Sequence, residues 1–195
     1  GQSQTRRMPH SKPARCSKYS VLVLQETDGG VMKLTTPLGG EVLDLTAGDR
    51  VLLSGTVYTA RDEAHLKIQE AGFPFNPKGA VLYHCGPVIQ DNAVVAAGPT
   101  TSARMNRLTK PMLDAGIRGL IGKGGMSDEV VEALRGRGVY FAFTGGCAAL
   151  AASCMRLKGV HYAELGMAEA VWEIELTDMP LVVGIDSKGN NLFQR

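Results

Sequence analysis

The chain has 195 residues, of which 44% are hydrophobic, and this is enough apolar material for one sizeable core but not for several domains. Its 21 basic and 19 acidic side chains leave a net charge of +2, which is too small to indicate a nucleic-acid partner or an anionic membrane surface. The sequence contains no run of about 20 apolar residues, so it predicts no membrane span.

Residues 1–31 are expected to lie outside the folded domain, although the segment 19–25 has the apolar content of a short strand. The first residues are polar and basic and lack the apolar core segment of a secretory signal. We interpret residues 1–31 as a disordered or expression-derived extension and residues 32–195 as one domain. No internal linker interrupts that domain.

Predicted strands and helices alternate through the middle of the chain. Apolar segments rich in β-branched residues indicate strands, and apolar residues at helical spacing among charges indicate helices. The predicted strands are 49–60, 79–86, 92–98, 119–125, 139–146, 171–176 and 181–186, and the predicted helices are 61–72, 100–116, 127–138 and 147–157. The second of these helices must bend or restart near Pro111. This order indicates a single α/β domain with a mixed sheet and flanking helices.

The cysteines show no C-x-x-C spacing, and they are Cys16, Cys85, Cys147 and Cys154. The last two are seven residues apart, which would put them on one face of the predicted apolar helix 147–157. We expect buried thiols in a reducing compartment, and hence a cytoplasmic protein. A metal or cluster site made only from this chain, and a disulfide, remain as alternatives.

The stretch GPTTSARM, residues 98–105, follows an apolar run and opens a predicted helix. If Thr100 is the N-cap, the amides of Thr101, Ser102 and Ala103 point outward at the positive end of the helix dipole, where an anion binds well. Arg104 is four residues beyond Thr100, so it projects from the same face and can hold a carboxylate. The alternative is an ordinary capped helix with a solvated arginine.

Two further cations also follow predicted strands. Arg61, with Asp62 beside it, comes after the strand 49–60, and Lys123 sits among glycines at the end of the strand GLI. Ligands of open α/β sheets bind at the carboxyl ends of the strands, so three cations there indicate a dianionic substrate. His65 is a candidate acid or base, and the alternative is a helix-surface or supporting histidine. The sequence does not decide whether His84 is functional or structural.

Eight short motifs, in order and without large gaps, resemble the β subunit of class I fumarases. They are TARDEAH (59–65), HCGP (84–87), GPTTSARM (98–105), IGKGGM (121–126), GGCAALAA (145–152), ELGM (164–167), EAVW (169–172) and IDSKGNNL (185–192). The same half resembles the β subunit of L(+)-tartrate dehydratase and the C-terminal domain of single-chain class I fumarases. The resemblance covers about residues 32–192.

The resemblance implies an iron–sulfur hydro-lyase that removes water from a 2-hydroxydicarboxylate. In that family a [4Fe-4S] cluster is held by three cysteines of the α half, and the β half is a swivelling β/β/α domain. We therefore expect this chain to bind no metal itself. An α subunit that carries the cluster is expected as its partner, in a hetero-oligomer for which two α and two β subunits are one arrangement.

The resemblance also assigns roles to individual residues. It implies that Thr100 is the base at the carbon that loses its proton, and that Arg61, Arg104 and Lys123 bind the dicarboxylate. A second tier of candidate site residues comprises Asp62, His65, Thr101 and Ser102. Because a free threonine hydroxyl is a poor base, a structural role for Thr100 with another residue as the base remains open.

The sequence leaves three functions open. Fumarase is favoured over tartrate dehydratase because it is the commoner activity, although no residue of this chain decides between the two substrates. The third is a swivelling module that binds without catalysis. The three cations that are expected to converge speak against that last interpretation.

Overall fold

A seven-stranded sheet forms the centre of the computed structural model, which describes residues 30–143 and 148–194. Its order is β1-β2-β3-β6-β7-β9-β8, and a further pairing joins β2 to β9. The strands are β1 (Met32–Thr35), β2 (Arg50–Thr59), β3 (Val81–Tyr83), β6 (Gly119–Gly122), β7 (Val139–Ala142), β8 (Met155–His161) and β9 (Val171–Ile185). Strands β1, β2, β3, β6 and β7 run parallel, whereas β9 is antiparallel to its neighbours. The predicted α/β domain with a mixed sheet is therefore confirmed.

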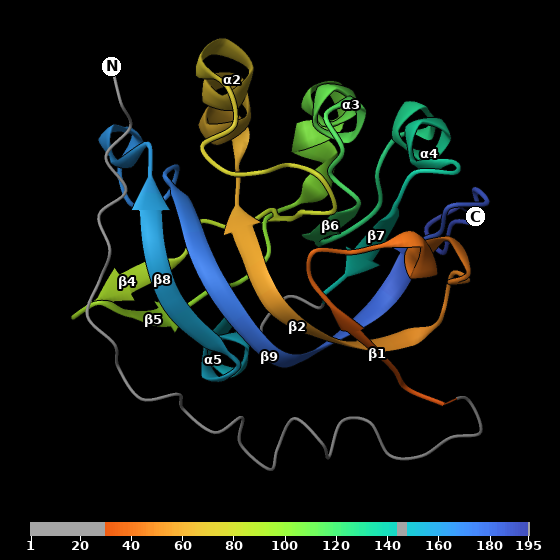
Figure 1. The fold of residues 1–195 in the computed structure, drawn as a ribbon, viewed down its shortest axis with the longest axis horizontal. Helices are drawn as coiled ribbons and strands as arrows, with labels where there is room; N and C mark the ends of the chain where they lie inside the picture. Colours follow the sequence, from red (N-terminus) through yellow and green to blue (C-terminus); the bar gives the residue numbers. More distant parts are fainter. Residues whose placement is uncertain (1–29, 144–147, 195) are drawn as a thin grey trace.

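The pairing of β2 with β9 closes β2, β3, β6, β7 and β9 into a ring. Helices connect the parallel strands of this ring and lie side by side along one side of it (Figure 1). They are α2 (Asp62–Ala71), α3 (Asn106–Asp114) and α4 (Asp128–Leu134). The opposite side carries α5 (Ala148–Ser153) and the hairpin of β4 (Val88–Gln90) and β5 (Ala93–Ala96) (Figure 1). Short 3-10 helices are η1 (Gly40–Leu43), η2 (Ser102–Met105) and η3 (Ala163–Leu165).

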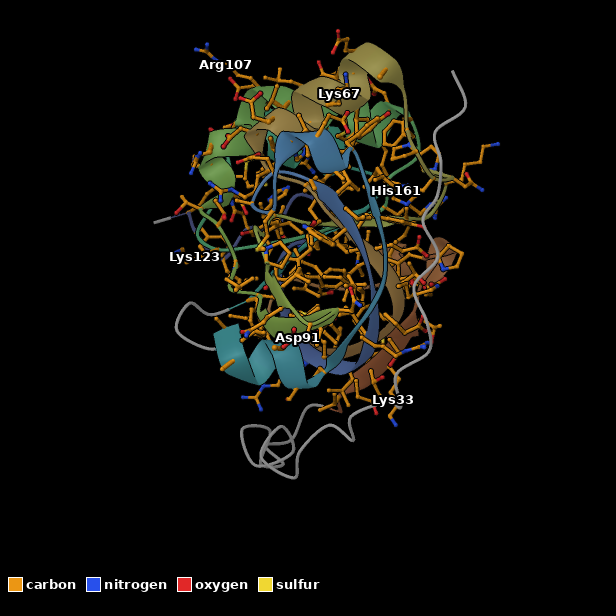
Figure 2. All side chains as sticks on the ribbon, turned by 90° about the vertical axis from the view of Figure 1, so that its left-hand side faces the viewer. Lys33, Lys67, Asp91, Arg107, Lys123 and His161 are labelled. Atoms are coloured by element: carbon orange, nitrogen blue, oxygen red, sulfur yellow. The ribbon has the colours of Figure 1, made fainter. Side chains whose placement is uncertain are left out.

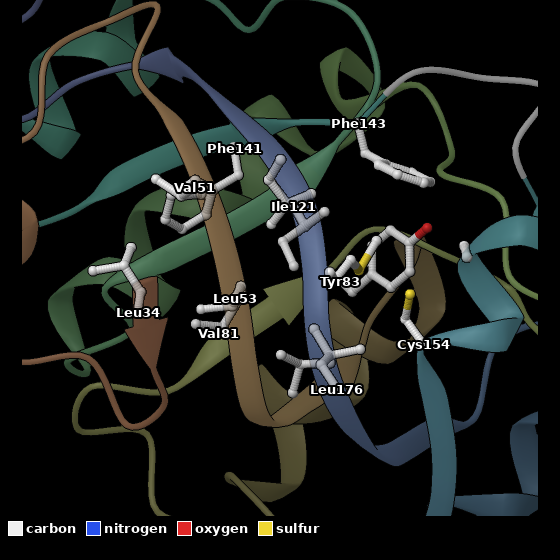
Figure 3. Packing of buried hydrophobic residues seen from close by; sticks show 14 of the residues in the cluster. Leu34, Val51, Leu53, Val81, Tyr83, Ile121, Phe141, Phe143, Cys154 and Leu176 are labelled. Carbon is white, nitrogen blue, oxygen red and sulfur yellow. The ribbon is translucent and has the colours of Figure 1, made fainter. Parts of the chain in front are cut away.

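The apolar side chains form two clusters, one on each side of the sheet. The first contains residues of the strands themselves together with residues of α5, and Figure 3 shows part of it, including Leu53, Val81, Tyr83, Ile121 and Phe141. The second lies under the three connecting helices and includes Ile68, Met112, Leu113, Val130 and Leu134. Each such side chain, when fully buried, contributes about 1.5–3 kcal/mol to the stability of the fold. The two clusters therefore hold the strands and their ends in place.

Strand β9 is continuous, whereas the sequence predicted two strands, 171–176 and 181–186. The prediction failed because Asp178 and Pro180 look like a break between them. Asp178 does take a left-handed conformation, with φ of 46°. Strand β2 accommodates it with a register shift at Gly55, and the Ser54 hydroxyl accepts a hydrogen bond of 2.9 Å from the Asp178 amide. The irregularities of the two strands therefore match, and the pairing continues past them.

The predicted helix 147–157 is wrong in its second half. Helix α5 ends at Ser153, and β8 begins at Met155. The reason is the segment MRLKGVH, in which buried and partly buried residues alternate, as they do in a strand. Cys154 therefore follows the helix. Cys147, with which it was predicted to share a helix face, lies outside the described residues.

The helix does not restart near Pro111, which was one of the two expected alternatives. Pro111 lies inside α3, and the change of helix type occurs at Asn106, where the 3-10 turn η2 gives way to α3. The connection 87–92 contains strand β4, which the sequence did not predict, and its turn uses left-handed Asp91 and Asn92. The remaining predicted strands and helices, except 19–25, are confirmed within a few residues over the described chain. Residues 144–146 of the predicted strand 139–146 lie outside it.

The predicted strand 19–25 lies outside the described residues. Within residues 30–143 and 148–194, none of the helices has the length and apolar character needed to cross a membrane.

Candidate functional site

Two of the predicted site residues follow the carboxyl ends of parallel strands in the large sheet, and a third strand lies between those two. Arg61 is the N-cap residue of α2, directly beyond β2, and His84 follows β3. Lys123 follows β6, which pairs with β3 in the sheet. Because parallel strands bring their carboxyl ends to one edge, Arg61 and Lys123 lie at the same edge of the sheet, as the sequence predicted. The third predicted cation, Arg104, instead follows β5, which belongs to the two-stranded sheet with β4.

A short segment, Thr100 to Ser102, is inserted between two of these strand ends. The Thr100 amide donates to the His84 carbonyl at 2.6 Å, and the Lys123 amide donates to the Thr100 carbonyl at 3.3 Å. The Ser102 amide in turn donates to the Lys123 carbonyl at 3.0 Å. Backbone hydrogen bonds therefore hold Thr100 and Lys123 next to each other, although the two residues are far apart in sequence.

The predicted anion site at a helix N-terminus is not formed. Thr101, not Thr100, occupies the N-cap position, and its side chain makes no capping hydrogen bond. The Ser102 amide is already used by the Lys123 carbonyl, and η2 has only four residues. Within the described part of the chain, no hydrogen bond is made by the Thr100 hydroxyl.

Arg61 is held by a carboxylate from the other end of the chain. Its Nε lies 3.3 Å from Oε1 of Glu169, and both side chains are about four-fifths buried, with exposures of 23% and 19%. Gly86 leaves room for the guanidinium, since a β-carbon there would lie 2.8 Å from Arg61 Nη1. The other oxygen of Glu169 accepts the amide of Glu63 in the first turn of α2, at 3.1 Å. One carboxylate thus orients Arg61 and stabilises the start of α2.

Arg104 forms an ion pair with Asp62, so the second-tier residue Asp62 orients a candidate substrate-binding arginine. The Arg104 side chain is half exposed, at 50%, and can reach a ligand. Lys123 is exposed and makes no ion pair within residues 30–143 and 148–194, and Figure 2 shows it at the surface, on the same side of that view as Arg107. Three cations against two carboxylates leave the site with an excess of positive charge.

The histidines His65 and His84 lie beneath the site and are fully buried. Their rings are 5.6 Å apart, and Nδ1 of His65 lies 2.7 Å from the Arg61 carbonyl oxygen, to which it donates. Burial lowers the pKa of His65, and burial together with the neighbouring His65 holds the pKa of His84 well below its usual value. Both are therefore neutral at pH 7, and His65 is not on the helix surface, which was one of the alternatives for it.

Residues 10–195 match the family model described as the fumarase C-terminus. The chain belongs to this family. Its similarity to individual relatives extends over most of the chain. The L(+)-tartrate dehydratase subunit beta of Escherichia coli K12 is 36% identical over 171 residues, which are 82% of this chain and 85% of that protein.

Two further relatives of this chain have provisional names. A protein of Methanocaldococcus jannaschii, named as an L(+)-tartrate dehydratase subunit beta, is 45% identical over 168 residues, which are 79% of this chain and 86% of that protein. A protein of Geobacillus stearothermophilus, named as a class I fumarate hydratase, is 36% identical over 182 residues, which are 89% of this chain but 35% of that protein. The family therefore contains both separate β subunits and longer single chains.

Three further residues at the candidate site were not identified from the sequence, namely Gly86, Tyr140 and Glu169. Gly86 and Glu169 lie in the motifs HCGP and EAVW, but neither motif indicates that its residue contacts Arg61. The Tyr140 hydroxyl donates to the Gly124 carbonyl at 2.7 Å, next to Lys123. Only the tertiary structure relates these residues to the site, because each lies far along the chain from the residue it contacts.

The described cysteines do not fit an iron–sulfur cluster. Cys85 and Cys154 are buried, as the sequence predicted, and burial raises the pKa of the Cys85 thiol to about 12. A thiol of that pKa is protonated at neutral pH and is a poor metal ligand. In the part of the chain that the structure describes, no three His, Cys, Asp or Glu side chains are grouped to hold a metal ion. Cys16 and Cys147 lie outside that part.

Proposed function

We propose that this chain is the β subunit of a hydro-lyase that interconverts fumarate and malate. It would supply carboxylate-binding side chains and a proton-transfer group to a site that an α subunit completes. The observation that carries the proposal is the placement of Arg61 and Lys123 beyond β2 and β6 at one edge of the sheet, with Arg104 paired to Asp62 beside Arg61.

The charge of the site suits a dicarboxylate. Arg61 and Arg104 are already oriented by Glu169 and Asp62, so little side-chain entropy is lost when they bind an anion. Lys123 has no carboxylate partner within the described residues, and it supplies the positive charge that attracts a dianion. A neutral substrate would leave these partly desolvated cations without compensation.

Thr100 is the residue to which we assign proton transfer. Its backbone carbonyl accepts the Lys123 amide, which places the residue next to Lys123. A hydroxyl removes a proton from carbon only if its alkoxide is stabilised, and nearby cations provide such stabilisation. In this proposal Thr100 takes the proton in the direction that forms fumarate and returns it in the direction that forms malate.

The partner in this proposal is an α subunit. Support comes from the two relatives that are named as β subunits, with lengths mostly covered by this chain. We propose that the [4Fe-4S] cluster expected for this family resides in that partner, since the described residues of this chain do not fit it. A swivelling motion of the domain and a cytoplasmic location belong to the same proposal and rest on the family resemblance.

A second candidate substrate is L(+)-tartrate, because the relatives at 45% and 36% identity over most of their length are named as tartrate dehydratase subunits. The cations described above would hold either dicarboxylate. Tartrate has one more hydroxyl, and its recognition would need an additional hydrogen-bonding group. That group would come from the α subunit in this alternative.

The deciding experiment is co-expression of the chain with its α subunit, anaerobic cluster reconstitution, and separate assays with malate and L(+)-tartrate. We expect fumarate to form from malate. We expect oxaloacetate to form from tartrate more slowly, or not at all. Activity with tartrate alone would replace the substrate and keep the residue roles. A complex with a full cluster that acts on neither would support a non-catalytic binding module.

A further inference from the structure

A chain of buried hydrogen bonds lies directly behind the substrate-facing segment. The Tyr140 hydroxyl is 2.7 Å from the Gly124 carbonyl oxygen and 3.1 Å from Ser102 Oγ. Ser102 Oγ is also 2.8 Å from Nδ1 of His84. The side chains of His84, Ser102 and Tyr140 are fully buried, so water does not compete for these bonds.

The hydrogens of this network can be assigned from its chemistry. The Gly124 carbonyl only accepts, so Tyr140 donates to it, and burial raises the Tyr140 pKa to about 12, which keeps that proton in place. The Ser102 hydroxyl then donates to the Tyr140 oxygen, and His84 donates from Nδ1 to Ser102. In this arrangement every hydrogen in the chain finds an acceptor, and Nε2 of His84 has no partner among the described residues.

A serine 2.8 Å from an imidazole nitrogen also resembles a nucleophile and its base. Burial excludes that role, because a substrate cannot reach a hydroxyl with no exposed surface. The close packing of Ser102 against Gly122 points to a structural site, since a β-carbon on Gly122 would overlap the Ser102 hydroxyl. The absence of a side chain at Gly122 is thus what admits the network.

Each link of the network is attached to a residue of the proposed site. The His84 carbonyl accepts the Thr100 amide, and the Ser102 amide donates to the Lys123 carbonyl. Gly124 follows Lys123 in a glycine turn with φ of 76°, which has no side chain to pack. The bond from Tyr140 is therefore the contact that fixes the carbonyl beside Lys123.

We propose that His84, Ser102 and Tyr140 are positioning residues that hold Thr100 and Lys123 in register for the reaction. None of the three touches the substrate. Ser102, which the sequence analysis grouped with possible ligand-binding residues, thus acts from behind the site. The inference rests on the proposed function for its effect on turnover, but its effect on the backbone is independent of that function.

The main variant is Tyr140→Phe, which removes only the hydroxyl. Its matched control is Tyr162→Phe, because the Tyr162 hydroxyl also donates to a glycine carbonyl, that of Gly72, at 2.6 Å. Gly72 is the C-cap residue of the ten-residue helix α2, whereas Arg61 is its N-cap residue, so the control lies about 15 Å from the site. Both variants remove one tyrosine hydroxyl bond from the fold.

The first measurement is amide hydrogen exchange on the full chain, at the amides of Thr100, Ser102 and Lys123. We expect Tyr140→Phe to speed exchange at these amides about tenfold relative to the rest of the sheet, and Tyr162→Phe to leave them unchanged. Equal exchange in Tyr140→Phe and the unmodified chain would overturn the inference. This readout does not depend on whether the complex is a fumarase.

The second measurement is steady-state kinetics in the complex with the α subunit. We expect Tyr140→Phe to lower kcat/KM about 10- to 100-fold, with most of the loss in kcat, because misplacement of reacting groups by less than 1 Å has effects of this size. A variant with altered exchange but unchanged kcat/KM would also overturn the inference. If the unmodified complex acts on neither malate nor tartrate, the proposed function fails, and the exchange rates alone decide the inference.

His84 offers a rescue test. In His84→Asn the amide nitrogen takes the place of Nδ1 and can still donate to Ser102, whereas in His84→Gln the amide takes the place of Nε2. We expect the Asn variant to keep slow exchange at Ser102 and Lys123 and the Gln variant to lose it. Loss in the Gln variant without rescue in the Asn variant would indicate that the volume of the ring matters and not its hydrogen bond, and would count against the inference.

Discussion

Arg61 and Glu169 form the ion pair that ties the start of α2 to the segment before β9, with 3.3 Å between Arg61 Nε and the carboxylate. The pair has two opposite effects on a substrate carboxylate. Glu169 orients the guanidinium, which favours binding, and it also partly neutralises the charge that the substrate would meet. Glu169 also accepts the Glu63 amide. A substitution that keeps this acceptor but removes the charge can therefore measure the balance of the two effects.

Glu169→Gln should lower KM for the dianionic substrate about two- to fivefold. Glutamine retains an oxygen acceptor for the Glu63 amide but removes one negative charge, and a two- to fivefold change corresponds to about 0.4–1 kcal/mol. Steady-state kinetics at low and moderate salt would measure it, with Glu164→Gln, an exposed acid in the same segment, as control. A higher KM in Glu169→Gln would mean that orientation outweighs charge.

Arg104→Ala should reduce kcat/KM about 10- to 100-fold and leave the fold intact. The side chain is half exposed, so its loss opens no cavity, whereas a charge-assisted hydrogen bond to a carboxylate contributes about 1.5–3 kcal/mol. The matched control is Arg107→Ala, which removes an exposed arginine three residues along the chain. If Arg104→Ala retained the kcat/KM of the unmodified complex, Arg104 would not belong to the site.

The placement of Arg61 and Lys123 at one edge of the sheet was predictable because it depends on a general property of parallel sheets. Arg61 and Lys123 each come directly after an apolar run, and the carboxyl ends of such runs meet at one edge. The pairing of Arg61 with Glu169 was not predictable, since it joins residues 108 positions apart through the closure of the sheet by β9. The sequence pattern of each segment contains no information about that contact.

Thr100 illustrates how tertiary pairing overrides a local rule. A threonine before a helical segment is a good N-cap, but here its amide and carbonyl bond to His84 and Lys123. Both backbone groups of Thr100 are thus hydrogen-bonded at the edge of the sheet, and the helical segment begins later, at Ser102. The same competition explains β8, where pairing with β9 converts a segment that looked like the end of a helix into a strand.

Gly122→Ala should destabilise the protein by about 1–3 kcal/mol, because its β-carbon would overlap the Ser102 hydroxyl and force the buried network apart. For a chain of this length that corresponds to a fall in Tm of about 2–12 °C. The control is Gly40→Ala, at which a β-carbon meets no atom within 4 Å. Thermal unfolding of the two variants measures the difference, and equal Tm values would show that Ser102 relaxes without cost.

Folding stability should fall as the pH drops below about 6.5, because His65 and His84 are held neutral in the folded chain and gain protons on unfolding. Both pKa values are lowered by burial, so between the folded and unfolded pKa values the unfolded state binds more protons, and the free energy of unfolding rises with pH. Each histidine contributes a slope of up to about 1.4 kcal/mol per pH unit in that window.

Urea unfolding between pH 7.5 and 5.5 measures this dependence, and His84→Asn provides the decisive comparison because it removes one titrating group and keeps a donor toward Ser102. We expect its slope below pH 6.5 to be smaller than that of the unmodified chain by up to about 1.4 kcal/mol per pH unit. An unchanged slope in this variant would mean that His84 is protonated in the folded protein, and its Nδ1 and Nε2 would then both need acceptors. Since Nε2 has no hydrogen-bond partner among the described residues, the neutral ring is the form that the structure supports.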